Sequence, residues 1–147
     1  HLPGHTAALA EAEAQLAQRL LPLLAAGAFD PPWVRDLART LGEPEERVRQ
    51  VLRKLLRRGD VAQIVKDLYY HRDQVRALAA LAADFAARPG GLNAAAFRDA
   101  TGLGRKRAIQ ILEFFDRVGY TRRVRDAHVL RHDSAYGGTQ PAPQPVS

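Results

Sequence analysis

An internal repeat with a period of about sixty residues is the feature that most constrains the fold of this chain. The segments LARTLG (37–42) and ERVRQVLRKLLRRG (46–59) align with FRDATG (97–102) and KRAIQILEFFDRVG (106–119). In both copies the apolar residues follow one another at intervals of three and four, which places them on one face of a helix. The glycines coincide where two helices are joined and where the second helix ends. The repeat therefore predicts two copies of one small, mainly helical domain.

Each copy has the same order of predicted elements. After the second glycine, two β-prone stretches flank a polar turn: VAQIV and LYYH around residues 66–67, then YTRRV and AHVLR around residues 125–126. Such a pattern predicts a hairpin. Another amphipathic helix precedes each helix pair, over residues 7–26 in the first copy and 73–87 in the second, and proline-containing segments end both. Three helices closed by a two-stranded wing form a winged helix, the helix-turn-helix variant whose third helix faces outward.

The predicted fold class is mainly α with small β-hairpin wings, in tandem winged-helix domains. Residues 1–71 form the first domain, which we expect to be a structural spacer, and residues 72–132 form the second. No long linker separates them, so the helix of the second domain should follow the first wing directly. Residues 133–147 are rich in Pro, Gly and Gln, and we predict that this tail is disordered.

Positive charge is concentrated in one segment of the chain. Residues 104–132 hold eight Lys and Arg against three Asp and Glu, which is +5 of the total formal charge of +6. The segments 1–71 and 72–103 each carry only +1. A localised excess of this kind is typical of a surface that binds a polyanion.

Several kinds of catalytic or metal site are excluded or disfavoured by residue content. There is no cysteine, and the serines Ser134 and Ser147 lie in the tail, so a nucleophilic thiol is impossible and a nucleophilic serine is implausible. The histidines lack metal-ligand spacing. Gly102 and Gly104 are not accompanied by the other glycines of a nucleotide-binding loop. We therefore predict no enzyme activity, no metal and no cofactor in this chain.

Other features bear on location. No apolar run approaches the roughly 20 residues that a transmembrane helix needs, and a signal-peptide pattern is missing. We expect a cytoplasmic protein with no membrane partner. The sequence starts at His1 and contains no methionine, which indicates a piece cut from a longer polypeptide.

The two third helices differ at their N-terminal ends. In the first copy three glutamates lie between residues 43 and 46, and they stabilise the helix dipole but repel phosphate. In the second copy Gly104 is followed by three cations at 105–107. Unpaired backbone N–H groups and cations at one helix end suit phosphate binding. Only the second domain is therefore predicted to bind nucleic acid.

The second wing adds further cations. Alternation along a strand places Tyr120, Arg122 and Val124 on one face and Thr121, Arg123 and Arg125 on the other. An isolated Arg-Arg pair is usually a solvated surface, and an outward glutamine is usually solvated as well, but the nearby helix cluster favours binding here. The candidate nucleic-acid-binding residues are Arg105, Lys106, Arg107, Gln110, Arg122, Arg123, Arg125 and His128. The strongest candidates are Arg105, Lys106, Arg122 and Arg123, whereas Arg117 and Arg131 are expected to be ordinary surface charges.

The stretch GLNAAAFRDATGLGRKRAIQILEFFDRVGYTRRVRDAHVLR (91–131) resembles the C-terminal winged-helix domain of the bacterial selenocysteine-specific translation elongation factors, SelB. The resemblance rests on FRD before the turn, G-R-K-x-A-I at the start of the third helix, LE-aromatic-x-D within it, and G-[YF]-TRR entering the wing. The preceding domain, with HLPGH and VKDLYYH, is similar to the penultimate winged-helix domain of that family. The GTPase domain and the selenocysteyl-tRNA site of the family lie upstream and are absent here.

The resemblance implies a specific partner. The last domain would bind an mRNA hairpin, the selenocysteine insertion element beside an in-frame UGA codon, and tether the factor there. The family's contacts would fall on Arg105, Lys106, Arg122 and Arg123, while Arg125 and His128 match less closely. The ribosome would be a partner of the full-length factor, which would be a GTPase, and the chain is expected to be a monomer.

Two other functions are compatible with the pattern. A DNA-binding transcription regulator would read the major groove with its third helix, but Glu113 and Asp116 follow the cationic start closely. Contact through the helix end suits RNA better, because the A-form major groove is too narrow for side chains. A protein-protein scaffold fits the first domain and leaves the cationic cluster of the second unexplained.

Overall fold

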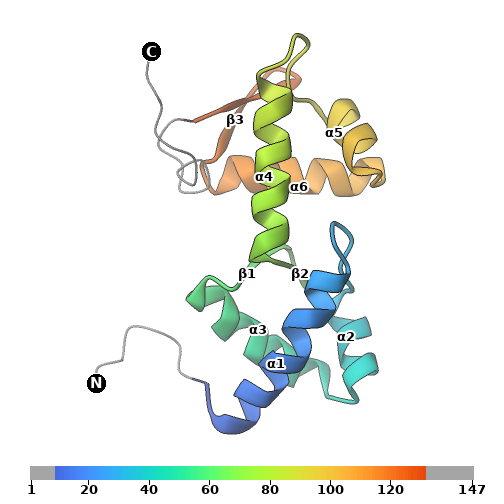
Figure 1. The fold of residues 1–147 in the computed structure, drawn as a ribbon, viewed down its shortest axis with the longest axis vertical. Coiled ribbons are helices and arrows are strands. Elements are labelled where there is room, and N and C mark those ends of the chain that lie inside the picture. Colours follow the sequence, from blue (N-terminus) through green and yellow to red (C-terminus); the bar gives the residue numbers. More distant parts are fainter. Residues whose placement is uncertain (1–8, 132–147) are drawn as a thin grey trace, which may run out of the picture. The chain divides into compact units, whose positions relative to one another are not determined.

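A computed structural model of the protein describes residues 9–131 (Figure 1). Its elements are α1 (Glu11–Ala26), α2 (Val34–Leu41), α3 (Glu45–Arg58), β1 (Val61–Val65), β2 (Leu68–His71), α4 (Arg72–Ala86), α5 (Ala94–Thr101), α6 (Arg105–Arg117), β3 (Thr121–Val124) and β4 (Ala127–Leu130). The contacts divide the chain into two compact units, with the division inside α4 between Val75 and Arg76. The mainly helical class with small hairpins is confirmed. The predicted disordered tail, 133–147, lies outside the described residues.

The first unit begins with a helix that is shorter than predicted. We expected a helix over 7–26, but α1 starts at Glu11, and Leu9 and Ala10 are not helical. The reason is a local cap: the Ala10 N–H donates to the Glu13 carboxylate at 3.0 Å, which satisfies a donor at the helix start. An alanine-rich sequence gives no local signal for the residue at which this helix begins. A hydrogen bond and ion pair with Lys54 of α3, 2.8 Å away, hold the pKa of Glu13 below its usual value.

The two glycines predicted to end helices do so in the first unit. Gly42 follows α2 with φ 68° and Gly59 follows α3 with φ 84°, both in the left-handed region that glycine adopts without steric cost. The α1 to α3 helices then enclose a core that also receives the hairpin. Its fully buried members include Leu20, Leu24, Leu37, Val48, Val51, Leu52 and Leu55.

The second unit repeats this design with a different start. The Asn93 side chain caps α5 by accepting the Ala96 N–H at 2.9 Å. Gly102 again has a left-handed φ of 75° between α5 and α6. Phe97 and Phe115 are fully buried. Burial raises the pKa of Tyr120, whose hydroxyl donates to the Ala79 carbonyl of α4 at 2.8 Å.

The two hairpins differ in regularity and exposure. The β1–β2 pairing is interrupted between Gln63 and Val65, and most of its residues are buried. The β3–β4 pairing is continuous, and most of its residues are exposed. The second hairpin, called the wing below (residues 121–130), also receives a neighbouring segment, because the His128 N–H donates to the Leu92 carbonyl at 2.8 Å. The wing of the second unit therefore presents most of its side chains to solvent.

Candidate nucleic-acid interface

The N-terminal end of α6 combines cations with backbone donors. Gly104 is the N-cap, and because glycine has no side chain it makes no capping hydrogen bond of its own. The first turn contains no acidic residue, and Arg105 and Lys106 are exposed while Arg107 is half-buried. The first N–H groups of a helix carry a partial positive charge and need acceptors. This end of α6 therefore offers both charge and hydrogen-bond donors to an anion.

A hollow of about 370 Å³ joins this helix end to the wing. Its lining residues are Asn93, Ala94, Ala95, Arg105, Ile109, Leu112, Glu113, Arg123, Asp126 and His128. Two predicted cations, Arg105 from α6 and Arg123 from β3, thus lie on the same concavity. Two carboxylates, Glu113 and Asp126, line it as well, so the local potential is mixed.

The base of the wing is fastened to α6 by one carboxylate. The Thr121 hydroxyl donates to Asp116 Oδ1 at 2.5 Å, and His128 Nδ1 lies 3.0 Å from the same carboxylate. Thr121 is 1% exposed and His128 is 7% exposed. Because one group on α6 contacts both strands, it sets the position of the wing on the helix. We call Asp116, Thr121 and His128 the wing clamp.

The tip of the wing holds a less favourable backbone conformation. Arg125 has a φ of 59°, the left-handed region that non-glycine residues seldom adopt. Its carbonyl accepts a hydrogen bond from Arg123 Nε at 2.8 Å. The tip therefore orients the guanidinium of Arg123 while leaving its two terminal nitrogens for other partners.

The faces of the wing are unequal. Thr121 and Arg123 share the face that turns toward α6, whereas Arg122 and Val124 share the opposite face. The strand β3 covers Thr121–Val124, so Tyr120 and Arg125 lie outside the predicted alternation. Tyr120 precedes the strand and is as buried as Thr121, because it packs on Phe115 with ring centroids 5.2 Å apart.

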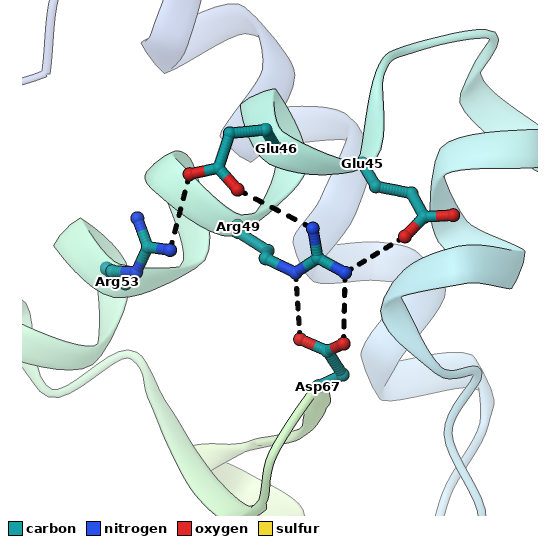
Figure 2. A network of polar contacts seen from close by, with 5 residues as sticks. All are labelled: Glu45, Glu46, Arg49, Arg53 and Asp67. Atoms are coloured by element: carbon teal, nitrogen blue, oxygen red, sulfur yellow. Dashed lines mark hydrogen bonds and ion pairs between the residues drawn. The ribbon is translucent and has the colours of Figure 1, made fainter.

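In the first unit, the charged side chains at the start of α3 and at the hairpin turn pair with one another (Figure 2). Arg49 of α3 donates to both oxygens of Asp67 at the hairpin turn, at 2.9 and 3.0 Å, and also to Glu45 at 2.9 Å. Glu46 contacts Arg49 at 3.5 Å and Arg53 at 3.4 Å. Hydrogen bonding from Arg49 holds the pKa of Asp67 below its usual value, and the pKa of Arg49 is raised by the same bond.

Both units are similar to winged-helix domains of known proteins. Residues 9–70 match the winged-helix domain of the selenocysteine-specific elongation factor, and residues 84–130 match another winged-helix domain of elongation factor SelB. The mRNA-binding domain of SelB from E. coli, solved in complex with SECIS RNA, is 42% identical with a TM-score of 0.77, over 84% of this chain and 99% of that one.

The chain belongs to the SelB family. The selenocysteine-specific elongation factor of Escherichia coli is 44% identical over 89% of this chain, and that of Haemophilus influenzae is 34% identical over 71% of it. These matches cover 21% and 17% of the relatives, so the chain spans about a fifth of their length. The predicted family and the winged-helix fold are confirmed.

Within this SelB chain the predicted site residues fall into three groups. Arg105, Lys106, Arg122, Arg123 and Arg125 are exposed, on the end of α6 and on the wing. Arg107 and Gln110 are half-buried on α6. His128 is buried in the wing clamp, although its ring also lines the hollow. The assignment of these residues to RNA stays a prediction.

Some residues around the SelB site were not identified from the sequence. Ala94 and Ala95 carry no chemical signal in the sequence, yet they line the hollow because Asn93 starts α5 beside the wing. Asn before an alanine run is an N-cap signal that points to this start. Asp116 was regarded only as an anion unfavourable to groove reading. Its contacts with Thr121 and His128 join residues that no local pattern connects.

No helix between residues 9 and 131 is both long and apolar enough to cross a membrane. In the same range, no group of three or more His, Asp or Glu side chains is placed to hold a metal ion.

Proposed function

We propose that this chain binds the mRNA hairpin that serves as a selenocysteine insertion element. The observation that carries the proposal is the similarity of this chain to the SelB mRNA-binding domain solved in complex with SECIS RNA. The two are 42% identical, and the match covers 99% of that SelB chain. Binding would tether the full-length factor, a GTPase acting in translation, at an in-frame UGA codon. The ribosome would be engaged through that factor, in the cytoplasm.

The second unit supplies the binding surface in this proposal. Arg105 and Lys106 at the start of α6, with Arg122 and Arg123 on the wing, would contact phosphates, and Arg107, Gln110 and Arg125 lie beside them. His128 contributes indirectly, because its ring is held by Asp116 and supports the wing. Phosphates carry no sequence information, so recognition of the hairpin depends on its shape and on unpaired bases.

The first unit serves as a spacer in this proposal. The cation that its third helix directs toward the hairpin turn, Arg49, is already engaged by Asp67 and Glu45 (Figure 2). Two glutamates stand in the first turn of α3, where α6 carries cations. This surface therefore repels a phosphate backbone. The chain acts as a monomer and needs no protein-bound metal or cofactor for RNA binding.

Competition binding tests the proposed function. A labelled hairpin with an unpaired loop is displaced by unlabelled hairpin or by duplex DNA of the same stem sequence, at equal salt. If four to six phosphates are contacted, the slope of log K against log salt should be about −3 to −5. Loop substitutions should cost about 1 to 3 kcal/mol and stem base-pair swaps much less.

The opposite outcomes identify the alternatives. Duplex DNA that competes as well as the hairpin would replace this function with that of a DNA-binding regulator. A salt slope near zero would contradict the electrostatic basis of binding. Arg57→Ala, which removes one exposed charge from the last turn of α3, serves as the matched control and should leave affinity unchanged within about twofold.

A further inference from the structure

The wing clamp fixes which nitrogen of the His128 ring carries the proton. His128 Nδ1 lies 3.0 Å from both oxygens of Asp116, and the Thr121 hydroxyl donates to Oδ1 of the same carboxylate. An ionised carboxylate can only accept hydrogen bonds, so Nδ1 must be the donor. The neutral ring therefore keeps its hydrogen on Nδ1, and Nε2 is the nitrogen that can take up a second proton.

Charged groups from several elements surround this ring. His128 is 7% exposed, and it lines the hollow together with residues of α6, β3 and the hairpin turn. Within residues 9–131, the charged groups beside the ring in the hollow and the clamp are Arg105, Arg123, Glu113, Asp126 and Asp116. The start of α5 also lines the hollow but contributes no charge. Two positive and three negative charges leave a net charge of −1 around the neutral ring, and protonation of His128 cancels it.

The first unit places other residue types at the two positions of this pair. In the sequence repeat Asp116 corresponds to Leu56, and in the hairpins His128 corresponds to Tyr69. The winged-helix fold therefore forms without a carboxylate–imidazole pair at this place. The pair belongs to the unit that carries the proposed binding surface, which indicates a role beyond holding the fold together.

We propose that hairpin binding is coupled to the protonation of His128, so that the wing clamp makes RNA affinity depend on pH. This inference rests on the proposed function. The phosphates of a bound hairpin add negative charge beside the hollow, and negative charge favours the protonated ring. Coupling between two ligands is reciprocal, so protonation must favour the hairpin by the same factor. Imidazoles titrate between about pH 5 and 8, so affinity rises as pH falls through this range and is lowest above it.

Asp116 offsets the cost of charging a ring that is almost fully buried. A buried imidazolium without an anion nearby is unfavourable, but here a carboxylate lies 3.0 Å from Nδ1. The ring is also fixed in place, because the His128 backbone N–H donates to the Leu92 carbonyl at 2.8 Å. Protonation therefore changes the charge beside Arg105 and Arg123 without requiring the wing to move.

Hairpin affinity as a function of pH tests the coupling. Binding is measured between about pH 5.5 and 8.5, at constant ionic strength, for the wild-type chain and for His128→Asn, whose amide can still donate to Asp116 but does not titrate. Wild-type affinity should rise by about two- to fivefold from high to low pH relative to the variant, as expected for one partly exposed ionic contact. Both chains bind the same RNA, so titration of the RNA itself cancels in this comparison.

A second histidine supplies the matched control. His71 is half-buried in the first hairpin, where its Nδ1 accepts the Asp73 N–H, and asparagine can accept the same hydrogen bond. The pH profile of His71→Asn should match that of the wild type. Nitrogen chemical shifts of the His128 ring in the wild-type chain give a readout that needs no variant: at about pH 7 the bound form should carry more protonated Nε2 than the free form.

Failure of this inference and failure of the proposed function give different results. Identical pH profiles for the wild type and His128→Asn, or ring shifts that do not change on binding, would show that RNA binding stands without proton coupling. A chain that binds no hairpin at any pH would refute both. Exchange protection of the Arg131 amide, which donates to the Tyr120 carbonyl, shows whether His128→Asn keeps its wing. If that protection is lost, the ring shifts of the wild-type chain decide alone.

Discussion

Asp116 is the residue whose replacement we expect to damage the second unit most. Its carboxylate accepts the Thr121 hydroxyl at 2.5 Å and contacts His128 Nδ1 at 3.0 Å. In Asp116→Ala both partners, buried at 1% and 7% exposure, lose their hydrogen bonds. A buried polar group left unsatisfied costs about 1 to 3 kcal/mol.

The expected total is smaller than the sum for two such groups. The Asp116 side chain is 24% exposed, so water can enter the space that the carboxylate leaves. We therefore expect Asp116→Ala to lower the free energy of unfolding of the second unit by about 2 to 4 kcal/mol. Asp116→Asn keeps an acceptor for Thr121 and should lose about half as much.

Amide hydrogen exchange measures the loss of stability at the wing itself. The His128 N–H, bonded to the Leu92 carbonyl, and the Arg131 N–H, bonded to the Tyr120 carbonyl, report the wing directly. Glu113→Ala removes an exposed carboxylate from the same helix and serves as the matched control, with an expected change below about 0.5 kcal/mol. A loss below about 0.5 kcal/mol for Asp116→Ala would refute the wing clamp.

Three other changes test the remaining interactions. Glu113→Gln removes a negative charge from the hollow that Arg105 and Arg123 line, and titration with the hairpin should show affinity increased by about twofold; a decrease would mean that the carboxylate itself contacts RNA. Arg125→Gly removes the steric cost of a left-handed φ at this position and should raise the thermal unfolding midpoint, while the lost charge weakens hairpin binding. A lowered midpoint would show that the backbone of Arg125 is not strained. The pKa of Asp67 is lowered in the folded state, so its contribution to stability is complete above its unfolded pKa and is lost as pH falls through the lower folded value. In an acid titration followed by Trp33 fluorescence, Asp67→Asn should therefore flatten the loss of stability below about pH 4. An unchanged titration would refute the hydrogen bond from Arg49 as the cause of the lowered pKa.

A substitution of Arg49 tests whether the first unit is a spacer or also contacts RNA. Arg49→Ala should destabilise that unit, because it leaves Asp67 without its bidentate partner, yet change hairpin affinity by less than about twofold. Trp33 fluorescence during denaturation measures the first effect and competition binding the second. A tenfold loss of affinity would show that the first unit also contacts RNA.

The order of elements was largely predictable because it follows from local chemistry. Helix faces appear as apolar residues at intervals of three and four, and Gly42, Gly59 and Gly102 adopt the left-handed backbone that side chains avoid. The position of the cationic end of α6 also follows from the sequence, since Gly104 and the cations after it are contiguous. The start of α1 was predicted wrongly, because the cap made by Glu13 on Ala10 competes with alanine's helical preference.

Alternation along β3 determined from the sequence alone that Arg122 and Arg123 leave opposite faces of the wing. Only the tertiary structure decided which face turns toward α6, because that depends on Asp116 contacting Thr121 and His128 from another element. In the same way, the pairing of Arg49 with Asp67, 18 residues apart, neutralises a cation that composition counts as available. Local patterns determine where each side chain stands on its own element. Hydrogen bonds and ion pairs between elements depend on distances in the folded chain, and these determine which charges remain exposed to a ligand.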